Sequence, residues 1–307
     1  MATSRSPLNP AHPAPSLDRT GLAHLAVVYV VWGSTYLAIR LAVREESGFP
    51  PLIMAFMRVA VASAILLAWS RLRRQRIRVT RAELGLLAGT GALLWLGGNG
   101  LVNVAEQHAD SGLAALLVAA MPIWAELIAA VLDRRLPSWR SAGSVLLGFL
   151  GVAALSWPLL RSGTRADVQG VVALIGAPFF WALGSIWLQR RRPKLGVLAI
   201  SGWQQALGGL ALLAMSLVTR EPRPQPTGEA WLAWGYLVCF GSVLAFTSYM
   251  SAIGRLPYRV VVTYSYANPV IAVFLGWLVL DEKVTLWTIG GAGLVVAGVA
   301  GIFQNRD

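Results

Sequence analysis

Ten apolar segments follow one another along the chain, each long enough to cross a bilayer as a helix, with short polar stretches between them. About 20 apolar residues are needed for one crossing. The segments lack the alternation of a barrel strand, and lipid offers no hydrogen-bond partner to an open backbone. The sequence therefore predicts an all-α polytopic membrane protein with ten transmembrane helices, over Leu22–Val43, Pro51–Ser70, Glu83–Val104, Gly112–Leu132, Trp139–Leu160, Gln169–Gln189, Gly196–Thr219, Trp231–Ile253, Val260–Leu280 and Val284–Phe303.

The composition agrees with a chain that lies in the lipid bilayer. Charged residues make up 13% of the chain and hydrophobic residues 56%, whereas a soluble domain carries about 25% charged residues. The net charge of +12 sits in short clusters between apolar runs, so no basic face is left for nucleic acid, and we expect no nucleic-acid partner. Residues 1–20 are rich in Pro, Ser and Ala, which predicts a disordered cytoplasmic tail rather than a signal peptide.

Motifs of enzyme chemistry are missing from the sequence. The single cysteine, Cys239, excludes a disulfide within the chain, and the three histidines are scattered without ligand spacing. We find no serine nucleophile elbow, paired acidic metal motif or nucleotide-binding loop. The sequence therefore predicts a protein that is not an enzyme and that carries no cofactor or metal.

The Lys and Arg residues favour one orientation in the membrane. With the amino terminus inside, eighteen of the 26 lie on the inner side and seven on the outer side, and the remaining one, Arg58, lies within a helix. Loops on the cytoplasmic side carry an excess of Lys and Arg. We therefore expect both chain termini in the cytoplasm, which an even number of helices also requires.

The two halves of the chain repeat one another. Pro122 and Pro269 are 147 residues apart, as are Gly143 and Gly290, and the pair Gly151-Val152 recurs at Gly298-Val299; Trp32 and Trp181 are 149 residues apart. Five helices are an odd number, so two copies must have opposite orientations in the membrane. Inverted repeats are a common build for secondary transporters, with the substrate site near the midplane between them. The predicted repeats are residues 22–160 and 169–303.

Several segments together resemble the EamA-type branch of the drug/metabolite transporter superfamily, with the closest likeness to the YedA-like inner-membrane permeases. They are Trp32-Gly33-Ser34-Thr35-Tyr36, Gly98-Asn99-Gly100, Ala105-Glu106-Gln107-His108, Ser111-Gly112-Leu113-Ala114-Ala115 and Ser265-Tyr266-Ala267-Asn268-Pro269-Val270. The resemblance implies a multi-pass protein of the bacterial inner membrane, with a central cavity that opens alternately to each side. It also implies export of small metabolites, amino acids or drug-like molecules.

Two ionisable residues within the apolar segments are candidates for function, because charge in lipid is costly unless it faces a cavity or a partner. Arg58 could anchor an anionic group of the substrate, or it could be a snorkelling or structurally paired arginine near the outer interface. Glu126 lies one turn after Pro122, which has no N–H and should kink its helix. Glu126 could carry a proton, or it could be hydrogen-bonded to a neighbouring helix.

A polar stripe runs along the third apolar segment. Asn99, Asn103 and Glu106 are spaced by four and three residues and share one face of a helix. This face could be a wall of the transport path, with Glu106 a second proton-coupling candidate. Hydrogen bonding between helices is the other interpretation.

Aromatic and amide side chains complete the predicted substrate site. Trp32 and Trp181 lie in the middle of their segments rather than at the interface, and Gln204 follows Trp203. Tyr264 and Asn268 share a face just before Pro269, the second expected kink. Rings with a few amides suit an amphipathic organic substrate.

The sequence thus predicts a secondary transporter of a small molecule. The alternative is a channel, or a structural or scaffolding membrane protein without transport. Small residues at Gly293, Ala297 and Gly301 let helices approach closely. They could join the two halves or make a homodimer, and both interpretations stay open.

Overall fold

The computed structural model describes residues 17–107, 111–161, 168–271 and 285–304, and these residues form helices and no strand. Nine helical spans in this part of the chain are long and apolar enough to cross a membrane. Among the described residues, six of these spans are single helices, and the other three are built from two or three pieces. The elements are α1 (Arg19–Val43), η1 (Glu45–Ser47), α2 (Pro51–Leu72), α3 (Arg81–Gly91), η2 (Ala92–Gly100), α4 (Leu101–Ala105), α5 (Ser111–Val118), α6 (Met121–Asp133), α7 (Trp139–Arg161), α8 (Val168–Arg190), α9 (Val197–Val218), α10 (Gly228–Tyr236), η3 (Leu237–Ala245), α11 (Phe246–Ile253), α12 (Tyr258–Val261) and α14 (Leu286–Gln304).

Turns break two of the expected helices within the described residues. The fourth, expected as one helix, breaks at residues 119–120 into α5 and α6, just before Pro122, whose ring cannot follow a regular turn. The ninth breaks at residues 262–263, and the helix then runs through Pro269 to residue 271. The break therefore lies earlier than the expected kink. Here the Thr263 hydroxyl donates to the Val260 carbonyl at 2.6 Å, and such side-chain bonds compete with the helical ones.

Parts of the expected elements lie outside the described residues. They include residues 1–16 of the expected tail, residues 272–280 of the ninth helix and the first residue of the tenth.

Polar side chains determine where several helices begin. The Asp18 carboxylate accepts a hydrogen bond from the Gly21 backbone at 2.9 Å and caps α1. Thr80 and Glu83 form a reciprocal capping box at the start of α3. The start of α2, at Pro51, is capped from a distance: the Glu221 carboxylate accepts from the Leu52 and Ile53 N–H groups at 2.9 and 2.8 Å. Each cap satisfies N–H groups that have no partner within the helix.

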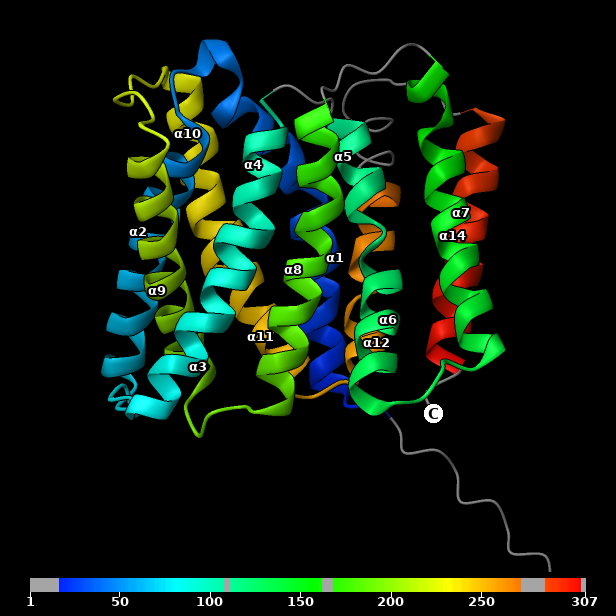
Figure 1. Ribbon diagram of the computed structural model, residues 1–307, viewed down its shortest axis with the longest axis horizontal. Coiled ribbons are helices and arrows are strands. Elements are labelled where there is room, and N and C mark those ends of the chain that lie inside the picture. Colours follow the sequence, from blue (N-terminus) through cyan, green and yellow to red (C-terminus); the bar gives the residue numbers. More distant parts are fainter. Residues whose placement is uncertain (1–16, 108–110, 162–167, 272–284, 305–307) are drawn as a thin grey trace, which may run out of the picture.

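Pairs of equivalent helices occupy the two ends of the bundle. Figure 1 shows α2 beside α9 at one end and α7 beside α14 at the other, and both pairs pack closely. In each pair one helix comes from the first half of the chain and its partner from the same position in the second half. α1 and α8, the first helices of the two halves, lie between the two pairs (Figure 1).

The α7–α14 contact is reciprocal. A Cβ added to Gly151 would meet Gly291 and Val295, and a Cβ added to Gly298 would meet Ser144 and Gly148. An offset of 147 residues converts the first set into the second, so each contact occurs twice with the roles exchanged, as a two-fold axis requires. Residues later in α7 contact residues earlier in α14, and the two helices are therefore antiparallel. The predicted fold of two inverted repeats is confirmed.

Candidate functional site

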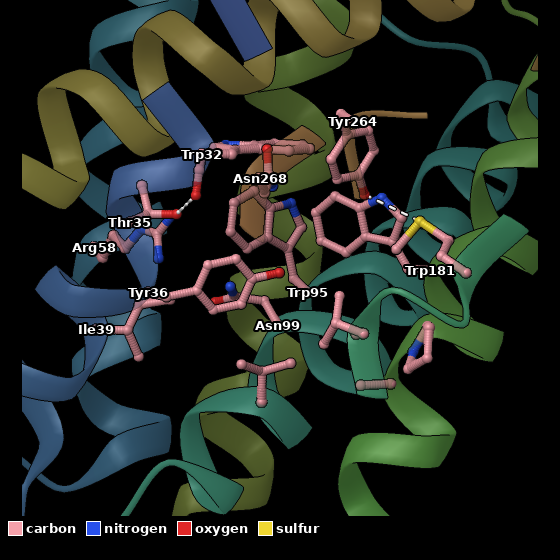
Figure 2. Close-up of a pocket in the computed structure, with 16 residues that line it drawn as sticks. Trp32, Thr35, Tyr36, Ile39, Arg58, Trp95, Asn99, Trp181, Tyr264 and Asn268 are labelled. Carbon is pink, nitrogen blue, oxygen red and sulfur yellow. Dashed lines mark hydrogen bonds between the residues drawn. The ribbon is translucent and has the colours of Figure 1, made fainter. Parts of the chain in front are cut away.

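A cavity lies between the two repeats (Figure 2). Six of the eight side chains predicted to bind substrate border it: Trp32, Arg58, Asn99, Trp181, Tyr264 and Asn268. Ten further residues complete the wall: Thr35, Tyr36, Ile39, Trp95, Gly98, Val102, Val118, Met121, Ala177 and Pro178. Both repeats thus contribute to one site, although their residues are far apart in the sequence.

The cavity extends from the middle of the bundle toward the end at which α1 ends and α2 begins. The part of α1 that borders it runs from Trp32 to Ile39, and α1 ends at Val43. In α2 the bordering residue is Arg58, about two turns from the start at Pro51. The cavity is therefore off-centre along the membrane normal.

Two π-helical segments flank this cavity, one in each repeat. η2 interrupts the third helix of the first repeat, and η3 interrupts the corresponding helix of the second. Trp95, Gly98 and Asn99 of η2 border the cavity. Gly98 allows a close approach, because a Cβ there would lie 2.6 Å from the Trp181 ring. π-Helical turns are rare and occur frequently at functional sites.

Arg58 is the only charged side chain in the described wall of the cavity. It is 3% exposed, and its Nε donates to the Ser242 hydroxyl of η3 at 2.7 Å. Its guanidinium carbon lies 5.7 Å from the centre of the Trp95 ring, a distance typical of a cation–π contact. Its NH1 atom is buried and has no hydrogen-bond partner. The described partners of Arg58 are therefore a hydroxyl and an aromatic ring, and no second charged residue borders the described part of the cavity.

Aromatic rings close the cavity on the side facing the start of α1. Trp32 and Trp181, the equivalent tryptophans of the two repeats, meet edge to face with ring centres 5.5 Å apart. Tyr249 and Tyr264 pack on Trp32, with their ring centres 5.0 and 4.9 Å from that of Trp32. The Tyr249 hydroxyl accepts from the Trp181 indole at 2.9 Å and lies 2.7 Å from the Ser185 hydroxyl. We call Trp32, Trp181, Tyr249 and Tyr264 the aromatic floor.

Polar contacts join α1 to the second repeat beyond the aromatic floor. The Tyr29 and Thr263 hydroxyls are hydrogen-bonded. His24 Nδ1 lies 3.3 Å from the Ser248 hydroxyl, and Arg255 pairs with Asp18 at 3.1 Å. The Gly21 N–H and Arg255 hold the pKa of the Asp18 carboxyl below its usual range, so this pair is charged at neutral pH. The end of the bundle where α1 begins is therefore closed by contacts between the repeats.

Two amides, Asn99 and Asn268, supply further polar atoms of the wall. The Asn99 side-chain oxygen accepts from the Asn103 amide at 3.4 Å. With its amide nitrogen turned toward the backbone, Asn268 donates to the carbonyls of Tyr29 and Tyr264 at 3.2 and 2.9 Å. These amides are therefore held in place by the protein itself.

Two of the predicted substrate-binding residues do not border the cavity. Asn103 is fully buried behind Asn99. Gln204 is also fully buried, and its amide donates to the Thr90 hydroxyl at 2.8 Å, which joins α9 to α3. The described contact of Asn103 lies within its own helical span, whereas that of Gln204 joins two helices.

The two proton-coupling candidates lie outside the cavity wall. Glu126, in α6, is 3.0 Å from Arg259 Nε and accepts from the Ser141 hydroxyl at 3.1 Å. Glu106 follows α4 and is 1% exposed, and both its carboxylate oxygens have no hydrogen-bond partner. Both acids are therefore buried, one with a cationic partner and one without hydrogen bonds.

Sequence reasoning missed Trp95, Tyr249 and Ser242. Trp95 is 1% exposed and Tyr249 is fully buried, yet Trp95 lies in an apolar run and Tyr249 among small hydroxyl residues, where a single aromatic residue does not stand out. The offset of 147 residues between the repeats was a usable signal for two of them. It pairs Trp95 with Ser242, and these residues lie in the two equivalent π-helical segments.

The fold and the cavity define a class of protein: a multi-pass membrane protein of two inverted helical repeats with a site between them. Residues 19–157 and residues 168–304 each match the model of the EamA-like transporter family. The chain belongs to the EamA-like transporter family and is a membrane transporter of that type, as the resemblance predicted.

Individual relatives agree with this assignment. The chain is 32% identical over 253 residues to the inner membrane transporter YedA of Escherichia coli (strain K12), covering 82% of this chain and 80% of that protein. It is 23% identical to the transporter YoaV of Bacillus subtilis (strain 168), over 91% of this chain and 94% of that protein. It is also 23% identical to an S-adenosylmethionine/S-adenosylhomocysteine transporter of Chlamydia muridarum (strain MoPn / Nigg), over 90% and 89% of the two chains. One solved crystal structure shares the fold, with a TM-score of 0.75 at 21% identity over 94% of this chain and 98% of that one.

Proposed function

We propose that this protein is a secondary transporter that exports a small organic molecule through the cavity by alternating access. The observation that carries the proposal is the cavity between two inverted repeats, closed toward one end by the aromatic floor. In an inverted-repeat transporter, rocking of one repeat against the other opens a central site to each side in turn. In this mechanism, the arrangement with the aromatic floor closed is the one in which the site is reached from the end opposite the start of α1.

The distribution of Lys and Arg over the loops predicts which side of the membrane the cavity faces. With both termini in the cytoplasm of a bacterial cell, the cavity faces outward and the aromatic floor separates it from the cytoplasm. Single cysteines placed at Gln75 and at Glu46, in a Cys239→Ser background, test this orientation in intact cells. A membrane-impermeant maleimide should label position 46 and not position 75; the reverse pattern would overturn the assignment.

Reconstitution tests transport itself. The purified protein in liposomes is screened with amino acids, nucleosides, organic acids and cationic dyes, with and without a pH gradient. We expect saturable flux for at least one class and acceleration by the same substrate on the opposite side of the membrane. Absence of flux above empty liposomes for every class would contradict transport and favour a scaffolding role. Flux that does not saturate and is not accelerated from the opposite side would favour a channel.

A further inference from the structure

The buried polar atoms of the described cavity wall that have no partner are hydrogen-bond donors. NH1 of Arg58 and Nε1 of Trp95 are both buried without an acceptor, and both residues border the cavity. Buried acceptors without a partner also occur, on Asn103, Glu106, Glu126, Gln204 and Gln205, but none of these residues borders it. The described wall therefore offers unused donors and one positive charge.

A buried guanidinium without a counter-charge is costly, because desolvation of a charged group is offset only by hydrogen bonds and an opposite charge. Ser242 satisfies Nε of Arg58, and the Trp95 ring faces the cation. NH1 has neither kind of partner, and no acidic side chain is among the described residues of the wall. An anionic group bound in the cavity would supply the missing acceptor.

The rest of the wall is suited to a flat apolar group. Trp32, Trp181, Tyr36 and Tyr264 present rings to the cavity, and Figure 2 shows them arranged around its centre with Arg58 to one side. Aromatic rings pack edge to face or offset against other rings. The cavity thus has an anion-binding side and an aromatic side.

We infer that the transported substrate is an organic carboxylate with a flat, apolar ring, and that Arg58 and Trp95 bind its carboxylate. This inference rests on the proposed transport function and names its substrate class. A carboxylate accepts charge-assisted hydrogen bonds from a guanidinium in a fixed planar geometry. A cationic amine of the same shape would meet Arg58 without an acidic partner, so the site should reject it.

Three ring compounds of matched shape, benzoate, benzamide and benzylamine, test the class on the unmodified protein, together with acetate, a carboxylate without a ring. Binding to the purified full chain in detergent is measured by calorimetry. We expect the affinity for benzoate to be at least about tenfold higher than that for benzylamine, because a hydrogen bond to a charged group contributes enough free energy for a tenfold change in affinity. Acetate should bind more weakly than benzoate because it lacks the ring. Equal or tighter binding of benzylamine, or no binding of benzoate, would overturn the inference.

Substitutions then test the residues. Arg58→Gln should reduce benzoate affinity about tenfold or more and leave benzamide nearly unchanged, because only the anion needs the charge. Trp95→Phe keeps the ring and removes the N–H, and should weaken benzoate binding by a smaller factor. Arg140→Gln is the matched control, because Arg140 also lies over a tryptophan ring, at 5.4 Å, but outside the cavity wall. Both variants should be folded, as shown by an unfolding temperature equal to that of the unmodified protein. If benzoate then binds both variants as tightly as the unmodified protein, Arg58 and Trp95 do not bind the carboxylate.

Flux separates this inference from the proposed function. Preference for benzoate in binding, with no flux of any compound, would retain the site and contradict transport. Flux of amines that exceeds flux of carboxylates would retain transport and contradict the carboxylate class.

Discussion

Asn99 and Gln204 show how one residue type serves different purposes within one bundle. Both are amides in apolar helices, yet Asn99 borders the cavity and Gln204 joins α9 to Thr90 of α3. An amide in a membrane helix needs a partner in either case. The spacing of amides along the chain does not distinguish an amide that borders the cavity from one that joins two helices. The residues around each amide in the folded protein do distinguish them.

These surroundings lead to a prediction for the two amides. Asn99→Leu should raise the half-saturation concentration of the transported substrate, by about tenfold if one polar contact is lost. Gln204→Leu should leave that concentration nearly unchanged and lower the free energy of unfolding by about 1 kcal/mol, the value of one hydrogen bond. Concentration-dependent flux and denaturant unfolding measure the two effects. A similar change in half-saturation concentration for both variants would contradict the assignment.

A second prediction at the scale of single residues concerns Glu126. Its ion pair with Arg259 joins α6 to the segment that begins at α12, and protonation of the carboxyl would release that contact. If Glu126 is the proton carrier, Glu126→Gln mimics the protonated state and should abolish the effect of a pH gradient on flux. Gradient-dependent flux of normal size in this variant would exclude the residue as the carrier and leave Glu106 as the candidate.

The helix pair α7 and α14 shows how small residues determine packing at the scale of elements. Gly148, Gly151, Gly291 and Gly298 lie at the contact, whereas no heavy atom lies near the side-chain position of Gly293. The stripe of Gly293, Ala297 and Gly301 therefore lies partly away from α7. Whether its outer part contacts a second copy stays a prediction, because the structure contains one chain.

A pair of substitutions on α14 tests this packing. A Cβ at Gly298 would lie 2.5 Å from the backbone nitrogen of Gly148, so one helix must shift. Gly298→Ala should lower the free energy of unfolding by about 1–3 kcal/mol, as overpacking typically does. Gly293→Ala, on the same helix with open space around it, should leave stability unchanged or slightly higher. Thermal unfolding in detergent compares them, and equal behaviour would contradict the described contact.

The start of α2 depends on a residue from the loop after α9. Glu221 accepts from two backbone N–H groups of α2 and from the Ser216 hydroxyl at 2.7 Å. Glu221→Ala should cost about 1–2 kcal/mol of unfolding free energy, because the N–H groups and the helix dipole lose their acceptor. Glu229→Ala, which removes an exposed ion pair with Arg44, should cost less than about 1 kcal/mol. Denaturant unfolding distinguishes these values, and a cost for Glu229→Ala as large as that for Glu221→Ala would contradict the capping role.

At the scale of the whole molecule, alternating access requires the closed end to open. His24 and Ser248 face one another across that end. Cysteines at these two positions, in a Cys239→Ser background, should be joined by a short thiol-specific cross-linker. The cross-link should stop flux, and its reductive cleavage should restore it, because the closed end can then no longer open. Each single-cysteine variant treated with the same reagent is the control, and normal flux through cross-linked protein would contradict alternating access.

Hydropathy and internal repetition by themselves determined the class of this protein. Apolar segments of membrane-spanning length must form helices in lipid, and an offset of 147 residues over five helices per copy implies inverted copies. The family resemblance and six residues of the cavity wall followed from the same sequence. These properties depend on local composition and counting, and no knowledge of packing is needed to obtain them.

Only the tertiary structure decided which polar side chains meet. Trp95, Tyr249 and Ser242 enter the site because helix rotation and two π-helical segments direct them there, and a π-turn shifts the face on which every later residue lies. The break at residues 262–263 likewise lies beside a side-chain hydrogen bond that the sequence did not reveal. A helix in an apolar sequence has no strong polar face to determine its rotation, and so close packing against its neighbours determines it.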